Sequence, residues 1–358
     1  MSDLAPQIGN RQSALGNSRI GRGELWSIAA WAGLVLLFPL LARSAYLRSV
    51  GVFIAIHTIA TVGLCLLAGY AGQISLGQAA FYGLGAYVSA ILTTRTGISP
   101  WIAMLAGMVL TGALAYGIGI PIFRLRGHYL AMATLALGII VYLGFVEFRD
   151  LTGGPSGLPG VPRLSLGPWT LAKDIQYYYV AWAMAFAVLL VSRNIVHSRV
   201  GRALRSIHGS EVAAETLGVD TARYKLQVFV LSAVYASLAG SLYAHYLSLV
   251  SPTPFGFIAS VELLVMAAVG GMASIWGAPF GAAAVTFLAE GSRALMPRLL
   301  SHASGEHEVI AYGALLVVIM IFMPEGLTAG TAAALRRLRA QRSPSTIRHP
   351  PSAPKGLS

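Results

Sequence analysis

Long apolar segments alternate with shorter polar ones along most of the chain. The apolar runs span residues 26–42, 50–70, 75–94, 99–122, 127–147, 176–192, 226–248, 259–271, 274–290 and 308–324. Most come close to the roughly 20 residues that an α-helix needs to cross the hydrocarbon core of a bilayer. The pattern predicts an all-α polytopic membrane protein with about ten transmembrane or half-spanning helices.

The polar parts of the chain divide it into three regions. Residues 1–25 are polar and are predicted to be a mobile N-terminus, and 26–326 form the membrane domain. Residues 327–358 end in a basic, Pro/Ser-rich sequence without an apolar period, which predicts a disordered tail. If the N-terminus lies inside, 17 of the 25 Lys and Arg residues fall on the cytoplasmic side. The positive-inside rule therefore predicts that both termini are cytoplasmic.

Composition supports the membrane assignment and narrows the possible partners. The chain is 56% hydrophobic and 11% charged, whereas soluble domains carry about 25% charged residues. Its net charge of +12 is located in inter-span loops and tails. This distribution indicates membrane topology rather than nucleic-acid binding.

Residues 193–226, which we call the polar island, interrupt the apolar pattern. Ser210 is a good N-cap, and Glu211 puts a negative charge at a helix N-terminus. Gly218 suits a left-handed C-cap. A helix of about two turns is therefore predicted between Ser210 and Gly218.

One face of this short helix is predicted to dock on another protein. Ala213, Ala214 and Leu217 stand at spacings that bring them onto one face. Two alanines on that face would allow another backbone to approach closely. The alternative interpretation is an ordinary solvated basic loop that obeys the positive-inside rule.

Two apolar stretches are predicted to contain broken helices. Residues 69–94 are rich in glycine and glutamine, and residues 261–290 are predicted to break at Gly270–Gly271 and again at Pro279. Broken helices at membrane depth occur inside protein or beside a watery cavity, and they often form transport pathways. The alternative is that the glycines only let neighbouring helices pack closely.

The same two stretches resemble each other. AGQISLGQAAF and GGMASIWGAPF, which begin at residues 71 and 270, match at Gly72/Gly271, Ser75/Ser274, Ala79/Ala278 and Phe81/Phe280. We take an internal duplication as a hypothesis.

The chain carries little catalytic chemistry. No lysine is preceded by glycine, so the phosphate-binding loop of ATPases is absent, and His307 begins a sequence that lacks the second histidine of a zinc helix. Neither catalytic residues nor a metal site are predicted. His57 and His245 lie within apolar runs, where each is either a hydrogen-bonded core residue or part of a pathway.

Several stretches resemble one known family in sequence and in order. They are GQISLGQAAFYGLGAY (72–87), RLRGHYLAMATLALG (124–138), LTGGPSGLPG (151–160), GRALRSIHGSEVAAETLGVDTARYKL (201–226), SPTPFGFIASVELLVMAAVGGMASIWGAPFGA (251–282) and the YG…PEGL close (312–327). Together they cover about residues 50–327. The chain resembles the permease subunit of bacterial branched-chain amino acid ABC importers, the LivM type.

The resemblance implies a set of partners and a role for the polar island. Such permeases work in the bacterial inner membrane with a second, LivH-type permease, two cytoplasmic ATPases that use the ATP, and a periplasmic substrate-binding protein. The polar island corresponds to the family's coupling loop. The expected ATPase-coupling residues are Arg202, Glu211, Ala213, Ala214 and Gly218. In one departure from the general importer pattern, Glu211 stands one residue early, with Val212 in the place of the glutamate.

The expected function is the ATP-driven import of leucine, isoleucine, valine or a related small solute, with no enzymatic activity and no cofactor bound by this chain. The candidate residues of the substrate pathway are Gln73, Ser75, Gln78, Tyr82 and Thr134. Similar permeases serve urea, short amides and other amino acids, so these substrates stay open. The alternative from another class is a channel or facilitator that works without ATP.

Overall fold

The computed structural model describes residues 33, 35–39, 44–125, 127–166, 169–171, 173–299 and 313, and helices dominate this part of the chain. Five helices within it are long and apolar enough to cross a membrane. They are Ala45–Tyr70, Pro100–Ile122, His128–Glu147, Asp174–His197 and Thr221–Leu247. This confirms the all-α, membrane-spanning character. The terminal regions 1–25 and 327–358 and the run at 308–324, apart from residue 313, lie outside the described residues, as does most of the run at 26–42.

The longer helices follow one another along the chain, with the longest connection between α6 and α8. They are α3 (Ala45–Leu64), α4 (Gln78–Thr96), α5 (Pro100–Ile122), α6 (His128–Glu147), α8 (Asp174–His197), α9 (Arg199–Gly209), α11 (Thr221–Leu247), α12 (Phe257–Gly270) and α13 (Gly277–Leu299). The shorter elements are the π-helix η2 (Cys65–Tyr70), α7 (Arg149–Thr152), η3 (Gly154–Ser156), α10 (Glu211–Thr216), η4 (Thr253–Phe255) and the two-residue strands β1 (Leu158–Pro159), β2 (Ser165–Leu166), β3 (Trp169–Thr170) and β4 (Leu249–Val250).

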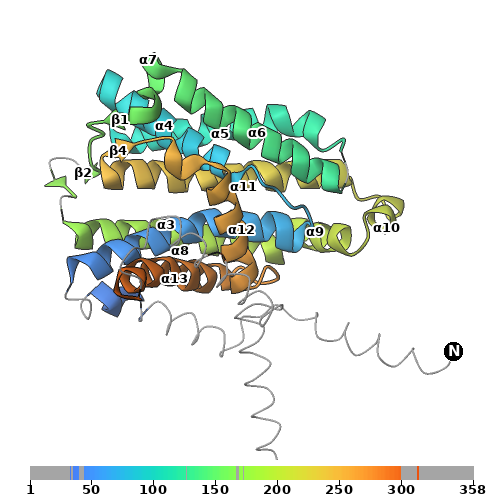
Figure 1. Ribbon diagram of the computed structural model, residues 1–358. Helices are drawn as coiled ribbons and strands as arrows, with labels where there is room; N and C mark the ends of the chain where they lie inside the picture. Colours follow the sequence, from blue (N-terminus) through green and yellow to red (C-terminus); the bar gives the residue numbers. More distant parts are fainter. Residues whose placement is uncertain are drawn as a thin grey trace, which may run out of the picture.

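The long helices form two groups that run in a common direction (Figure 1). One group holds α4, α5, α6 and α11, the other holds α3, α8 and α13, and α12 crosses between them. Helices α3 and α11 join the groups by direct contact. Helices α9 and α10 lie at one end of the bundle, and α7 with β1, β2 and β4 lies at the opposite end. We call these the α10 end and the α7 end.

Close backbone approach explains two of the glycines. An added Cβ on Gly85 of α4 would lie 2.1 Å from the carbonyl oxygen of Ser237 on α11, and one on Gly240 of α11 would lie 1.8 Å from that of Tyr82. Contacts this short leave no room for a side chain. For Gly85, therefore, the structure favours the close-packing alternative.

The connection between α6 and α8 is compact and tied to the bundle, as its glycines and prolines suggest. Strand β1 pairs with β4, and the Trp101 indole donates a hydrogen bond to the Ser165 carbonyl oxygen at 2.7 Å. The His245 ring joins this connection to α4, with Nδ1 2.7 Å from the Pro162 carbonyl oxygen and Nε2 2.8 Å from Ser89 Oγ. His245 is therefore a hydrogen-bonded core residue, which was one of the two alternatives.

Candidate functional site: two broken helices and a polar island

The chain leaves helical geometry between η2 and α4, over residues 71–77, which we call the first break. Just before it, the α-helix becomes the π-helix η2, a rare form that is frequent at functional sites. Gly72 follows with a left-handed φ of +67°, which a residue without a Cβ adopts at little steric cost. The predicted break within 69–94 is confirmed.

Side chains from other helices hold the first break. The Leu76 N–H donates to Thr134 Oγ1 of α6 at 3.1 Å, and the Ala79 N–H donates to Ser260 Oγ of α12 at 2.9 Å. The first N–H groups of an α-helix have no partner within the helix. The Ser260 hydroxyl therefore replaces a bond that water would supply in an exposed helix, and the Thr134 hydroxyl pairs a backbone N–H just before the helix.

A third helix, α11, binds the side chain of Gln78. Gln78 Nε2 donates to the Ser232 carbonyl oxygen at 3.1 Å, and Ser232 Oγ donates to Gln78 Oε1 at 3.3 Å. Both residues are buried. Both polar atoms of the Gln78 amide are thus hydrogen-bonded to Ser232.

The predicted pathway residues gather at the first break, but most are enclosed. Ser75, Gln78 and Thr134 are each about 1% exposed, and their polar groups are hydrogen-bonded within the chain. Gln73 is half-buried, and its amide donates to a backbone carbonyl two residues earlier. In this conformation these side chains support the break.

Tyr82 differs from the other four. Its hydroxyl is buried and has no hydrogen-bond partner among the described residues. Its ring packs edge-on against Tyr243 and Phe255, with centroids 5.6 and 5.2 Å away. Within the described part of the chain, the Tyr82 hydroxyl is therefore an unsatisfied polar group inside an aromatic cluster.

The second break covers residues 271–276, between α12 and α13. Gly271 has a φ of +99°, and its N–H donates to the carbonyls of the last turn of α12. The Ser274 N–H then donates to the Gly271 carbonyl, and the Gly277 N–H to the Ser274 carbonyl, each at 3.0 Å. The predicted break at Gly270–Gly271 is confirmed, and successive backbone turns hold it.

The further break predicted at Pro279 is wrong. Helix α13 begins at Gly277 and runs through Pro279, which lies in its first turn. Proline is tolerated there because the N–H that it lacks would have no partner within the helix. Glycines instead bring α13 against α12, since an added Cβ on Gly281 would lie 1.9 Å from the Met266 carbonyl oxygen.

The two breaks share a local pattern. In each, a left-handed glycine, Gly72 or Gly271, precedes the start of the next helix by six residues, at Gln78 and Gly277. These are the stretches that the sequence aligns. The internal duplication stays a hypothesis, and this shared geometry supports it.

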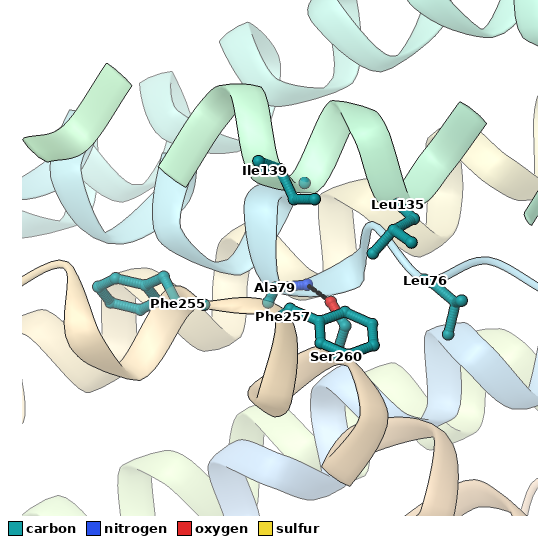
Figure 2. Close-up of a pocket in the computed structure, with 9 residues that line it drawn as sticks. Leu76, Ala79, Leu135, Ile139, Phe255, Phe257 and Ser260 are labelled. Atoms are coloured by element: carbon teal, nitrogen blue, oxygen red, sulfur yellow. Dashed lines mark hydrogen bonds between the residues drawn. The ribbon is translucent and has the colours of Figure 1, made fainter. Parts of the chain in front are cut away.

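A shallow apolar notch adjoins the first break, with an empty volume of about 170 Å³ that includes open solvent. It is lined by Leu76, Ala79, Leu135, Gly138, Ile139, Phe255, Gly256, Phe257 and Ser260. Figure 2 shows Leu135 and Ile139 on α6 above the notch, with the Ala79–Ser260 hydrogen bond beneath it. The Ser260 hydroxyl is thus engaged by the start of α4, and the exposed lining is mainly apolar.

The polar island folds as two capped helices, α9 and α10. Ser198 Oγ accepts from the Val200 N–H at 3.1 Å, and Ser210 Oγ accepts from the Ala213 N–H at 3.3 Å. Gly218 has a φ of +81°, as expected for a left-handed C-cap. The Ser210 and Gly218 predictions are therefore confirmed.

The faces of α10 differ from the expected docking face. Ala214 is 1% exposed and packs into the chain itself, whereas Leu217 is 81% exposed and Val212 65% exposed. Ala213 is also exposed. The predicted grouping of Ala213, Ala214 and Leu217 on one face is therefore corrected, because Ala214 faces inward.

Helix α10 is fixed to the start of α11 by a charged contact. Lys225 Nζ lies 2.5 Å from Glu211 Oε1, and the Lys225 side chain is 6% exposed. The Thr221 hydroxyl also donates to Glu215 Oε1 at 2.7 Å. Arg202 of α9, by contrast, is exposed. The Glu211 carboxylate thus binds a residue of its own chain.

Sequence reasoning missed the partners of these residues. Ser232, Ser260 and Lys225 are the important omissions. Ser260 is the single hydroxyl in the apolar run 259–271, which could have marked it as a partner for a broken helix. Among the residues that the structure describes, no cluster of three or more His, Cys, Asp and Glu could hold a metal ion.

Comparison with known proteins gives a consistent result. Residues 46–324 match the family described as the permease component of branched-chain amino acid transport systems. The chain is 32% identical over 296 residues to the high-affinity branched-chain amino acid transport system permease protein LivM of Salmonella typhimurium, which covers 76% of this chain and 67% of that protein. It is 27% identical over 289 residues to LivH of Escherichia coli, covering 76% and 90%. It is 26% identical over 246 residues to the ribose import permease protein RbsC of Escherichia coli, covering 66% and 74%.

Proposed function

Since the chain belongs to the family of permease components of branched-chain amino acid ABC transport systems, we propose that it carries leucine, isoleucine or valine across a bacterial inner membrane. It is a multi-pass transport subunit and not an enzyme. The observation that carries the proposal is the match over residues 46–324, which includes both breaks and the polar island. Branched-chain transport in the LivM and LivH relatives favours these three substrates.

The partners follow from the same relatives. We propose that this chain pairs with a second permease of the LivH type, two cytoplasmic ATPases and a periplasmic substrate-binding protein. ATP is then used by the ATPases alone, and this chain needs no bound cofactor. Lipid or the second permease would cover the exposed apolar side chains of α5 and α6, such as Val109 and Ile140.

The polar island is the proposed contact with the ATPases. Helix α10 presents Val212, Ala213 and Leu217, and its left-handed end at Gly218 is exposed with open space around it. Arg202 adds an exposed positive charge nearby on α9. In this orientation the α10 end is cytoplasmic, and so are both termini of the chain.

The Glu211–Lys225 pair gives the contact a mechanical role. Because the pair fastens α10 to α11, a displacement of α10 is transmitted to a long helix that packs against α3, α4 and α5. Ala214 contributes from the inner side by seating α10 on its own chain. Glu211 and Ala214 therefore act within the chain, while Arg202, Ala213 and Gly218 face the partner.

The substrate pathway is proposed to run beside the first break. Gln73, Ser75, Gln78, Tyr82 and Thr134 would become accessible when the break rearranges during the transport cycle. The apolar notch at Leu135 and Ile139 offers aliphatic contacts of the kind that a branched side chain requires. A small number of polar groups in a mainly apolar path suits an amphiphilic amino acid.

Uptake of labelled leucine tests the proposal. The permeases, ATPases and binding protein are reconstituted in vesicles, and urea is measured in parallel. Leucine uptake that requires ATP is the expected result. Uptake of urea alone would keep the importer and change the substrate, whereas uptake of either solute without ATP would make the chain a facilitator.

A further inference from the structure

Three segments that are distant in sequence meet at the α10 end of α3. They are η2 with the first break, the second break, and the last turns of α9. An added Cβ on Gly69 of η2 would lie 1.8 Å from the Met272 carbonyl oxygen in the second break. The Tyr70 hydroxyl also interacts with the backbone of Ile275 and lies near Arg205 of α9. The second break is therefore in direct contact with η2, the helix that leads into the first break.

Helix α9 touches the first break at His208. An added Cβ on Gly72 would lie 3.0 Å from His208 Nδ1 and 3.6 Å from both Cγ and Cα of His208. Gly72 is also the left-handed residue at which the helix opens, with a φ of +67°. The His208 imidazole thus lies against Gly72, the residue at which the chain leaves helical geometry.

His208 is also the described α9 side chain nearest in sequence to α10. Only Gly209 separates it from Ser210, the N-cap of α10. Helix α9 is anchored in the body of the protein through Leu204, one turn before His208, and through Ile207, both buried. A displacement of α10 would therefore be passed along the backbone through Ser210 and Gly209 to His208. The rest of α9 is held in place by its buried residues.

We propose that His208 is a positioning residue through which the polar island acts on both breaks. Its imidazole contacts Gly72 in the first break, and η2, which leads into that break, contacts the second break through Gly69 and Met272. The breaks then move together when α10 is displaced. This inference rests on the proposed role of the polar island as the ATPase contact.

Substitution of His208 in the complete importer tests this role. His208→Ala removes the ring atoms nearest Gly72 and keeps the His208 Cα. We expect leucine uptake per ATP hydrolysed to fall about tenfold, within the usual range of coupling between sites. Assembly and the ATPase rate without substrate should not change. His208→Asn keeps an atom close to the position of Nδ1 and should restore most of the coupling. His197→Ala is the matched control, because His197 bonds to the Arg193 carbonyl of its own helix.

Hydrogen exchange in the same complex reports on the breaks themselves. Binding of a non-hydrolysable ATP analogue should change the exchange of 71–77 and 271–276 together in the wild type, and His208→Ala should abolish both changes. Equal coupling in His208→Ala and wild type, or an unaltered exchange response in the variant, would overturn the inference. Failure of the proposed function is distinguishable, since the wild-type complex would then show no ATP-linked uptake.

Discussion

The two breaks have the same backbone pattern but are held in different ways. Thr134, Ser260 and Ser232, on three other helices, bond the first break and the start of α4. The second break is held by its own backbone turns and by close packing of glycines. A break that depends on side-chain hydroxyls can exchange partners at little cost, whereas one built on backbone contact tolerates no change in volume. The first break is therefore suited to exchanging its hydrogen-bond partners, and the second to moving as a unit that keeps its internal packing.

The largest effect is expected from added volume beside the second break, where α13 packs against α12. Gly281→Ala would place a methyl group 1.9 Å from the Met266 carbonyl oxygen, and overpacking of this kind costs about 1–3 kcal/mol or more. Thermal unfolding of the purified permease complex in detergent should show a clearly lower Tm. Gly291→Ala, in the same helix but with open space around it, should leave the Tm unchanged or raise it. Equal Tm values for the two variants would contradict the tight backbone contact.

Loss of a hydroxyl at the first break should have the next largest effect. Thr134→Val leaves the Leu76 N–H without an acceptor, and a buried unsatisfied donor costs about 1–3 kcal/mol. Thr111→Val is the matched control, because the Thr111 hydroxyl is buried without a partner among the described residues. In the same unfolding assay, Thr134→Val should have a lower Tm than Thr111→Val. Thr134→Ser keeps the hydroxyl and should recover the Tm. If Thr111→Val lowered the Tm and Thr134→Val did not, the hydrogen bond from Leu76 to Thr134 would not be what stabilises the first break.

A smaller effect is expected at the start of α4. Ser260→Ala removes the acceptor of the Ala79 N–H, and loss of a helix N-terminal acceptor costs about 1 kcal/mol. Stability should fall modestly, while leucine affinity shifts if the pathway runs beside this point. Uptake kinetics measured with the unfolding curve would show both. If neither the Tm nor the uptake kinetics of Ser260→Ala changed, Ser260 would not stabilise the start of α4 or lie beside the pathway.

The smallest effect is expected from replacing Ser75 and Ser274, the two serines that align between the breaks. Ser75→Ala removes an acceptor 3.4 Å from the Gly77 N–H, a weak bond worth less than about 1 kcal/mol. Ser274→Ala should be neutral, because the backbone of Ser274, rather than its side chain, carries the turn. Paired Tm measurements test this difference. A Ser274 variant that is less stable than the Ser75 variant would show that side chains also hold the second break.

Hydropathy predicted the long helices well but could not supply their partners. The runs at 99–122 and 127–147 correspond closely to α5 and α6, because an apolar stretch of this length has few other stable forms in a bilayer. Glycine patterns located both breaks. The hydrogen bonds at the first break join residues 58 and 181 positions apart, such as Leu76 with Thr134 and Ala79 with Ser260, so tertiary packing decides them.

The polar island was predicted in outline rather than in orientation. Its caps were readable because Ser210 and Gly218 act locally. The direction of Ala214 was not, since a six-residue helix can turn any face toward the body that supports it. Lys225 was counted as a topological charge, and its pairing with Glu211 depended on how α10 folds back on α11.

In the proposed mechanism, ATPases drive this permease through the exposed end of α10. The most direct measurement is leucine-stimulated ATP hydrolysis in the reconstituted complex carrying Gly218→Asp, which adds charge and bulk at that end. Gly97→Asp is the control, because Gly97 is also left-handed, with a φ of +65°, has open space around it and ends α4, near the α7 end of the bundle. We expect Gly218→Asp to abolish stimulation while the complex still assembles, and Gly97→Asp to retain it. Normal stimulation in Gly218→Asp would show that the ATPases do not act through this end of α10.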